Sequence, residues 1–422
     1  MPAQDQRAPP SLPPDSRGPR FGRTFAALRH RNYRLWFVGQ LVSLVGSWMQ
    51  ITAQGYLVYE LTRSPAYLGL VGFANGVPAW LFMLLGGVAA DRVSRRRLLI
   101  ASQTAMMLLA AVLAMLTFSG QVQAWHIVAL TFGLGIANAF DAPARQAFVV
   151  EMVAREDLGN AIALNSLIFN LASALGPAAA GVLYALLGPG WCFTLNALSF
   201  VAVLVALLFM RVAPKAPTTG ARSAVAELRE GLAYVVGERR VAVLLALVIA
   251  MSLFGVSFVT LMPAWAVSVL GGDARTYGFL QSARGVGALL GALILATWSQ
   301  ARAPGRTLSL GSLVFPVLIL AFAASRSLPL SLLVLVGVGW GFLVFFNGAN
   351  LLLQTLTPDH LRGRVMSIYT LTFFGFMPVG SLFAGALAER FGEPATVALG
   401  AALCLVVAGA VWWKVPQLRE AI

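Results

Sequence analysis

The sequence predicts an all-α membrane protein in which twelve transmembrane helices form two pseudo-repeated bundles of six. The first observation is twelve apolar stretches along the 422 residues, each near the length of about 20 residues that an α-helix needs to cross the hydrocarbon core. Hydrophobic residues make up 59% of the chain and charged residues only 11%. The second observation is an alternation of basic residues between connections, and the third is a local similarity between the two halves.

Lysines and arginines gather on every second connection. Of the 30, 25 lie in the N-terminal tail, in or beside the even-numbered connections, or at the C-terminus, and 4 lie in the odd-numbered connections. Short cytoplasmic loops are enriched in these residues, so the pattern places both termini in the cytoplasm. It also accounts for the net charge of +14, so we expect no nucleic acid as a partner.

The first half is expected to be a tail and a bundle. Residues 1–24 contain six prolines and almost no apolar cluster, which predicts a disordered cytoplasmic tail. The N-terminal six-helix bundle is expected over residues 25–211. Its spans are placed at 35–59, 67–90, 97–118, 125–147, 160–187 and 191–211.

The second half begins after the longest connection, residues 212–240. Val225, Leu228, Leu232 and Val235 recur there at helical spacing, which predicts an amphipathic helix on the cytoplasmic surface. A C-terminal six-helix bundle follows over residues 241–414, and residues 415–422 form a cytoplasmic C-terminus. Its spans are placed at 241–268, 276–298, 307–325, 328–352, 365–388 and 395–414.

The two halves resemble degenerate copies of each other. Tyr67-Leu68-Gly69 opens the second span and Tyr277-Gly278-Phe279 opens the eighth. Two parallel six-span repeats are a common transporter architecture, with the substrate site between them near the bilayer midplane.

A charged motif follows the second span. It consists of Gly87, Asp91, Arg92, Arg95 and Arg96, and an acid among several arginines can form an ion-pair network. Glycines at this point allow close helix packing. The alternative is a loop of the positive-inside type with one isolated acid.

This loop motif resembles the loop between spans two and three of the major facilitator superfamily, with Ser94 where the family has glycine. The resemblance implies a twelve-span transporter in which the Asp91 region contacts the eleventh span and holds the cytoplasmic side shut.

The fifth span carries Gly176, Pro177 and Gly181. The run resembles the antiporter motif of the superfamily's exporters, which implies export, and its small residues favour packing against a helix of the other half. Ordinary small-residue packing is the alternative.

A polar stripe follows one face of the first span. Its residues recur at steps of three and four, so they share a helical face: Gln40, Ser43, Ser47, Gln50 and Gln54. Unpartnered polar groups facing lipid are costly, so the stripe is expected to line a substrate cavity or, alternatively, to hydrogen-bond to other helices.

The fourth span ends with Asn138, Asp141 and Arg145 on one face. Charges within a span are functional candidates. We expect either a charge relay with a titrating Asp141 or a permanent Asp141–Arg145 ion pair. The run and the connection Glu230-Gly231-Leu232-Ala233-Tyr234 resemble the enterobactin-exporter-like branch of the superfamily.

Further polar residues complete the predicted site. Arg284 lies inside a span and is expected either to face the cavity, where it would bind an anion or pair with an acid, or to reach the outer interface. Asn350 is a further lining candidate, and Glu60 is the second candidate for carrying a proton.

Other chemistry is not indicated. Cys192 and Cys404 have no metal-ligand spacing, so no metal site is expected. The spans carry no set of paired catalytic groups, so no enzyme is expected, and no ATP-binding P-loop motif occurs.

The sequence therefore favours a monomeric secondary transporter in a bacterial inner membrane. It would export a small, fairly hydrophobic siderophore or drug, driven by the proton-motive force without a cofactor. A uniporter or importer, a lysophospholipid translocator and a non-transporting membrane sensor or scaffold are the alternatives.

Overall fold

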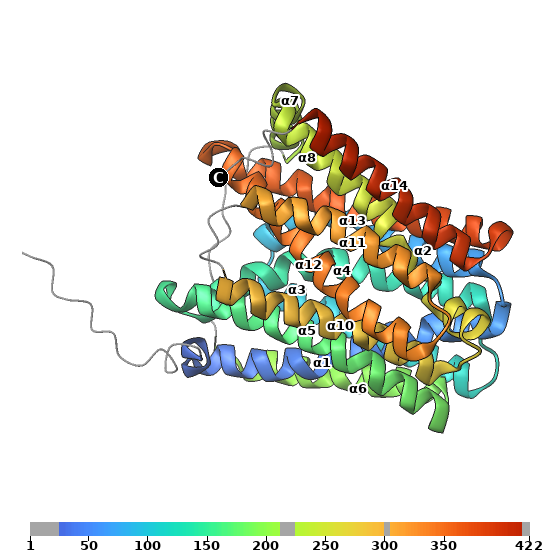
Figure 1. Ribbon diagram of the computed structural model, residues 1–422. Coiled ribbons are helices and arrows are strands. Elements are labelled where there is room, and N and C mark those ends of the chain that lie inside the picture. Colours follow the sequence, from blue (N-terminus) through green and yellow to red (C-terminus); the bar gives the residue numbers. More distant parts are fainter. Residues whose placement is uncertain (1–24, 212–223, 299–303, 416–422) are drawn as a thin grey trace, which may run out of the picture.

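The computed structural model describes residues 25–211, 224–298 and 304–415 (Figure 1). The tail at 1–24, the first part of the connection at 212–223 and residues 416–422 lie outside the described residues. The predictions made for those segments, and the predicted domain boundaries, stay predictions.

Twelve long helical segments run across the described part of the chain, as the fold class predicts. In the first half they are α1 (Arg31–Thr62), α2 (Pro65–Arg92), α3 (Arg95–Phe118), α4 (Ala124–Met152), α5 (Leu158–Leu187) and α6 (Pro189–Phe209). In the second half, after a broken seventh span, they are α10 (Ala274–Trp298), α11 (Pro304–Ala324), α12 (Leu328–Leu356), α13 (Asp359–Phe391) and α14 (Glu393–Lys414). Short 3-10 turns occur at Ala26–Arg29 and Arg155–Asp157.

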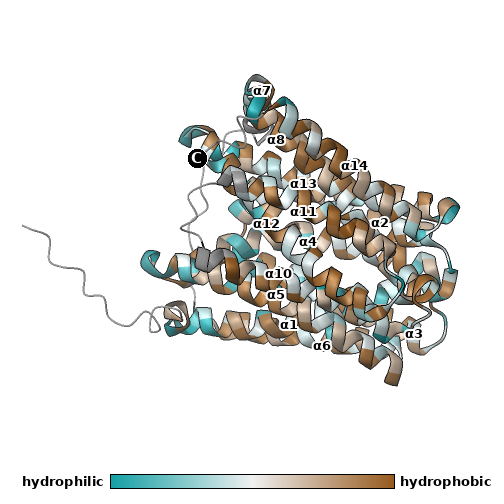
Figure 2. Ribbon diagram, in the orientation of Figure 1, coloured by the Kyte–Doolittle hydropathy of each residue, from teal (hydrophilic) through white to brown (hydrophobic). Residues whose placement is uncertain are grey.

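Ten helices among the described residues are long and apolar enough to cross a membrane. The two long helices outside that set are α1 and α10, which carry the polar stripe and Arg284. Large apolar side chains remain exposed along the bundle, such as Leu85, Leu198 and Val406. Figure 2 shows hydrophobic ribbon along the helices and hydrophilic ribbon at their ends, as expected for a protein surrounded by lipid.

Proline and glycine explain several helix boundaries. Pro189 lies in the first turn of α6, where the missing N–H costs nothing. Gly188 ends α5 and Gly392 ends α13, and both have positive φ values of 88° and 78°. Glycine adopts this backbone conformation without a steric penalty, so the chain can turn sharply into the next helix.

The seventh span is interrupted rather than continuous. It comprises α8 (Arg239–Ala250), a π-helical turn at Met251–Gly255, a 3-10 turn at Ser257–Leu261, α9 (Met262–Ala264) and a second π-helical turn at Trp265–Val269. Proline inside a helix removes a backbone donor, and Pro263 lies within this stretch. The span predicted at residues 241–268 is confirmed as one apolar stretch long enough to cross a membrane, Arg239–Val269, although its helix is interrupted.

The connection before the seventh span contains α7 (Ala224–Gly237), as the periodicity predicts. This helix packs on the start of α13: Gly231 lies against Ile368 and Arg364, and Arg364 forms an ion pair with Glu230. Tyr234 donates a hydrogen bond to the Leu356 carbonyl at 3.3 Å. The helix therefore joins the ends of α12 and α13.

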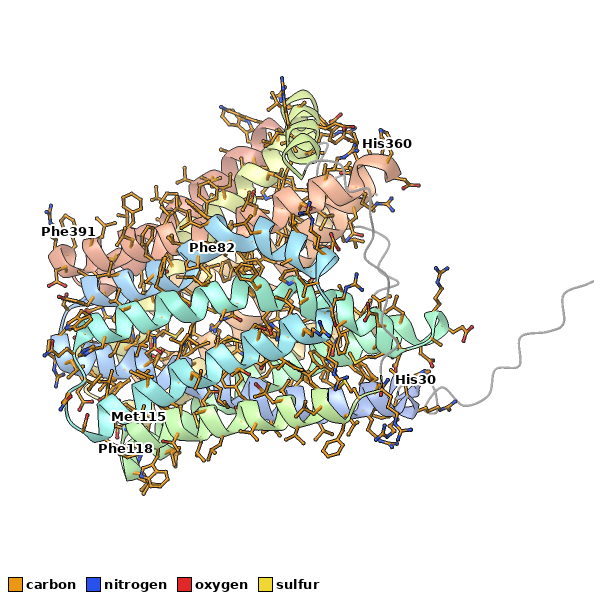
Figure 3. The ribbon with its side chains drawn as sticks, turned by 180° about the vertical axis from the view of Figure 1, so that it is seen from behind. His30, Phe82, Met115, Phe118, His360 and Phe391 are labelled. Carbon is orange, nitrogen blue, oxygen red and sulfur yellow. The ribbon has the colours of Figure 1, made fainter. Side chains whose placement is uncertain are left out.

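The bundle has two chemically different ends. One end carries the connections at 92–95, 152–158, 237–239 and 356–359, and we call it the arginine-rich end because Arg92, Arg95, Arg239 and Arg362 lie there. The opposite end carries the turns near Gly120, Gly188, Gly271 and Gly392. In Figure 3, His30 and His360 lie at the arginine-rich end, and Phe118 and Phe391 lie at the opposite end.

Helices from the first half pack against helices of the second half near the opposite end. α2 lies along α13, and α5 lies along α10. A side chain at Gly69 or Gly76 of α2 would collide with Ser381 or Pro378 of α13. These contacts involve the first half of α2 and the second half of α13, so they join the two halves of the chain at the opposite end.

Candidate functional site

The loop motif lies open at the arginine-rich end. Asp91 and Arg92 end α2 with exposed side chains, and Asp91 has no ion pair or hydrogen bond within the described residues. Arg95 instead pairs with Glu151 of α4 at 2.6 Å. Among the described residues, this conformation therefore shows no ion-pair network around Asp91, since Arg92 is exposed and Arg95 reaches α4.

The glycines and the remaining arginine of this motif have separate surroundings. A Cβ at Gly86 would collide with the Ala139 carbonyl of α4, whereas a Cβ at Gly87 would meet nothing within 4 Å. Arg96 donates to the Leu208 carbonyl at 3.0 Å, at the end of α6. The close helix approach thus depends on Gly86. Among the described residues, no hydrogen bond or ion pair joins the Asp91 region to the eleventh span, α13.

The glycines of the fifth span lie where helices meet. Gly176 faces Trp48 and Val45 of α1. Gly181 faces α10, with its Cβ position 2.7 Å from the Ala274 carbonyl and 3.1 Å from the Gly278 Cα. Pro177 is buried in the same helix. The motif therefore forms part of the contact between the two halves.

The polar stripe of α1 is mostly buried in this conformation. Asn196 of α6 donates to Gln50 at 2.6 Å, and Gln54 donates to Thr131 of α4 at 2.5 Å. In this conformation, these two glutamines therefore form hydrogen bonds to other helices, which was the alternative to lining a cavity. Ser47 bonds to the carbonyl of Ser43 in its own helix at 2.9 Å.

Asp141 is the centre of a polar cluster between α3 and α4. Its side chain is 1% exposed. The Oδ1 atom accepts hydrogen bonds from Ser102 Oγ at 2.9 Å and from Gln103 Nε2 at 2.8 Å. The Oδ2 atom lies 3.3 Å from Arg145 Nε, but this contact is not aligned as a hydrogen bond, and Oδ2 has no other partner.

Arg145 connects this cluster to the stripe. Its Nη1 atom donates a long hydrogen bond of 3.5 Å to Gln40 Oε1 of α1. Asn138 lies about one turn before Asp141 on the same face of α4, and it is exposed although it lies in the middle of the span. Sequence spacing predicted that these side chains share a face, but it gave no indication of the partners on α3.

Arg284 has a polar column beside it on α10. Its Nε atom donates to Gln281 Oε1 at 3.3 Å, and Gln281 Nε2 donates to the Tyr277 hydroxyl at 3.2 Å. The Tyr277 ring stacks on Tyr56 of α1, with ring centroids 6.5 Å apart. The spacing of residues 277, 281 and 284 places these side chains on one helical face, but it does not indicate the hydrogen bonds between them.

The other predicted residues lie apart from this column. Asn350 of α12 accepts a hydrogen bond from Gln354 at 2.6 Å and is partly exposed. Glu60 lies exposed near the opposite end of α1 and accepts a hydrogen bond from Tyr184 of α5. Glu60 and Asp141 therefore belong to different regions of the molecule.

A carboxylate at the opposite end joins the two halves. Glu389 of α13 accepts a hydrogen bond from Ser64 Oγ at 2.7 Å and from the Ala66 backbone N–H at 3.1 Å. It therefore caps the start of α2 from the other half of the chain. Sequence analysis cannot find such a cap, because it needs the pairing of α2 with α13.

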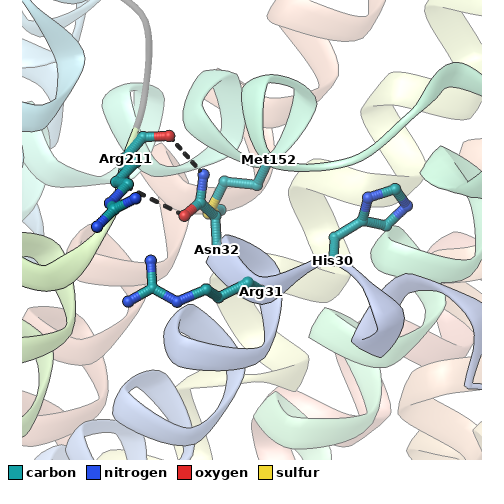
Figure 4. A pocket seen from close by; sticks show the side chains of 5 residues that line it. All are labelled: His30, Arg31, Asn32, Met152 and Arg211. Carbon is teal, nitrogen blue, oxygen red and sulfur yellow. Dashed lines mark hydrogen bonds between the residues drawn. The ribbon is translucent and has the colours of Figure 1, made fainter.

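A separate polar pocket of about 490 Å³ lies at the arginine-rich end (Figure 4), lined by His30, Arg31, Asn32, Met152 and Arg211. Asn32 donates to the Arg211 carbonyl at 2.8 Å and accepts from its backbone N–H at 3.2 Å. This pairing attaches the end of α6 to the start of α1, so it has an evident structural role.

Several solved structures share the fold of this chain. The chain resembles a bacterial homologue of the human lysosomal transporter Spinster in an inward-facing conformation, with a TM-score of 0.71, 14% identity, and coverage of 93% of this chain and 98% of that one. A POT family transporter in complex with a thioalcohol-conjugated peptide gives a TM-score of 0.74 at 15% identity, covering 92% and 96%. The fold is that of a multi-pass transporter of the major facilitator type.

Sequence comparison then gives the family. A family model described as transmembrane secretion effector matches residues 22–421, and the chain belongs to that family. It is 25% identical to the staphyloferrin A transporter of Staphylococcus aureus over 363 residues, or 85% of this chain and 90% of the relative. It is 27% identical to the multidrug efflux pump Tap of Mycolicibacterium fortuitum over 390 residues, or 90% and 94%.

A third relative is the enterobactin exporter EntS of Shigella boydii, 24% identical over 394 residues and 93% of both chains. The predicted superfamily and its exporter branch are thus confirmed. The family and these relatives are membrane transporters rather than enzymes.

Proposed function

We propose that this chain is a secondary active transporter that exports a siderophore or a drug across a bacterial inner membrane in exchange for protons. The relatives include a staphyloferrin A transporter, a multidrug efflux pump and an enterobactin exporter. The excess of basic residues at one end supports a cytoplasmic location for that end. The protein would act as a monomer in the bilayer, with both termini in the cytoplasm and without a cofactor.

Alternating access is supported by the contrast between the two ends. The halves are joined at the opposite end by the glycine contacts of α2 and α5 and by the Glu389 cap. At the arginine-rich end, Asp91 of α2 and Asp359 of α13 are both exposed. This contrast supports an arrangement that is open to the cytoplasm, and closing that end would require the two bundles to rock about the midplane.

The single observation that carries proton coupling is the incomplete bonding of Asp141. The carboxylate is buried, its Oδ1 is held by two donors, and its Oδ2 lacks a hydrogen bond. Oδ2 is therefore the carboxylate oxygen that no hydrogen-bond donor occupies. Neutralising Asp141 would weaken its attraction for Arg145, which would shift the guanidinium toward Gln40 and link protonation to α1.

The proposal is tested in inverted membrane vesicles from a pump-deficient bacterial host. The vesicles are energised with a pH gradient, and siderophores and lipophilic drugs are added one at a time. We expect at least one compound to be taken up while the gradient is partly dissipated. Asp141→Asn should lower this exchange by about 100-fold or more, the lower end of the range attributed to one positioned proton-transfer group.

Asp157→Asn is the matched control, because Asp157 also pairs with a basic residue, His30 at 2.8 Å, but lies at the arginine-rich end. It should retain the exchange. Uptake that ignores the pH gradient would instead support a uniporter. If no compound moves in either membrane orientation, a sensor or scaffold role would replace transport, and a lysophospholipid that moves alone would identify a lipid translocator.

A further inference from the structure

We propose that the transported molecule is an organic anion and that Arg284 is the cation that binds it. This inference rests on the proposed function and selects a substrate class within it. It requires that Arg284 lies at membrane depth, faces the interior of the protein, has no acidic partner and has donor groups available.

Arg284 lies near the middle of the membrane. It follows Ala274, the first residue of α10, by ten residues, which is about 15 Å along a helix at 1.5 Å per residue. The hydrocarbon core is about 30 Å thick. The side chain is thus far from both helix ends, and the alternative of reaching the outer interface is disfavoured.

The side chain also points away from lipid. The exposed apolar face of α10 is formed by Phe279, Val286, Leu290 and Leu293. At about 100° per residue, Tyr277, Gln281 and Arg284 lie on the opposite side of the helix. Ser282 and Gly285 contact α5, while Gly287 contacts α12. Arg284 therefore lies between these two helices and faces the centre of the bundle.

Nothing in the described part of the chain neutralises Arg284. Apart from Asp141, the described acids in the membrane-spanning helices lie within three residues of a helix end: Glu60, Asp91, Glu151, Asp359, Glu389 and Glu393. Among the residues that the structure describes, Asp141 is the one acid at membrane depth, and it forms an ion pair with Arg145. The described residues at this depth include two cations, Arg145 and Arg284, and one anion, Asp141. The middle of the bundle therefore carries one uncompensated positive charge.

An uncompensated charge in a span is costly, so its retention favours a role in binding. Gln281 accepts from Nε of Arg284, and the terminal amino groups of that guanidinium have no hydrogen-bond partner among the described residues. A guanidinium with free amino groups binds a carboxylate or similar oxyanion through two parallel hydrogen bonds. Gln281 in turn is oriented by Tyr277, so the column positions the guanidinium.

The test uses two dyes that share a xanthene skeleton and carry opposite charge, carboxyfluorescein and rhodamine 123. Binding to purified protein in lipid nanodiscs is measured by fluorescence anisotropy. The wild-type protein should bind carboxyfluorescein more tightly than rhodamine 123. Arg284→Gln should weaken that binding by about 10- to 100-fold, as for a hydrogen bond to a charged group, and leave rhodamine binding unchanged or stronger.

Arg275→Gln is the matched control, because it removes the same charge from the first turn of the same helix, where Arg275 is exposed. It should bind both dyes as the wild type does. Arg284→Glu should reverse the preference toward rhodamine 123, and such a reversal cannot come from misfolding. A wild type that binds rhodamine as tightly as carboxyfluorescein, or an Arg284→Gln variant that binds both dyes unchanged, would overturn the proposal.

Binding and transport separate this inference from the proposed function. If carboxyfluorescein binds through Arg284 but no compound exchanges with protons in vesicles, the anion site stands and the transport proposal fails. If cationic compounds exchange with protons in an Asp141-dependent way and carboxyfluorescein does not bind, transport stands and the anion site is refuted.

Discussion

Single buried polar side chains determine how the first half is held together. Gln50 lies 3% exposed between α1 and α6, and its amide oxygen accepts a hydrogen bond from Asn196. Hydrogen bonds between transmembrane helices contribute about 0.6 to 2 kcal/mol. A donor left without a partner in this environment costs more than the bond contributes.

We therefore expect Gln50→Leu to lower the free energy of unfolding of the purified protein by about 1–2 kcal/mol, because Asn196 loses its hydrogen-bond acceptor. The double variant Gln50→Leu/Asn196→Leu should recover part of this loss, since both polar partners are then removed. Thermal unfolding in detergent measures both. Unchanged stability together with an altered range of exported compounds would show that Gln50 lines the cavity instead.

At the same scale, the sequence could predict faces but not partners. The spacing of Gln50 from Gln54 and of Asp141 from Arg145 placed each pair on one helical side. The bonds to Asn196, Thr131, Ser102 and Gln103 depend on which helices are neighbours. That information is long-range, and a single sequence does not contain it.

Helices meet through glycines at the contact between the two halves. Gly181 of α5 and Gly278 of α10 lie with their backbones nearly touching, because neither has a side chain. Small residues allow such close approach in membranes, where packing rather than the hydrophobic effect drives association. These contacts form and break if the two halves move relative to each other.

Gly181→Leu should reduce transport in the vesicle assay by about 10-fold or more, an estimate based on the cost of overpacking. A leucine there would force α5 away from α10 and open the opposite end. Gly409→Leu is the matched control, because a Cβ at that helical glycine of α14 meets nothing within 4 Å. Equal effects of both substitutions on transport at equal expression would contradict a specific role for this contact.

The positions of the helices could be predicted from the sequence, but the interruptions within a helix could not. The sequence predicted a helix at each of the twelve spans, although α1 and α10 fall outside the ten that are long and apolar enough by themselves. The helix before the seventh span follows from its period of 3.6. The break of the seventh span at Met251–Leu261 was missed, because the stretch stays apolar throughout. Its irregular turns reflect Pro263 and packing, such as Gly255 against Phe315 and Cys404.

In the whole molecule, the two halves are joined at the opposite end and are not joined by the loop motif at the arginine-rich end. Glu389 and the glycine contacts connect the halves at the opposite end, whereas the loop motif at the arginine-rich end has no partner on α13 among the described residues. The family resemblance predicted a closed arginine-rich end, and the difference is explained if the molecule alternates between two arrangements. In the second arrangement, Asp91 would contact α13 and the Glu389 cap would be lost.

The most direct test of this account is a distance measurement between the two halves at the arginine-rich end. Spin labels are placed at Val93 and His360, which are exposed at the ends of α2 and α13, in a variant without the buried Cys192 and Cys404. Val93 and Arg155, both in the first half, provide the control pair. We expect the Val93–His360 distances to form two populations, with the shorter one growing when an exported compound is added, while the control pair stays constant. A single Val93–His360 distance that no compound or pH changes would contradict alternating access.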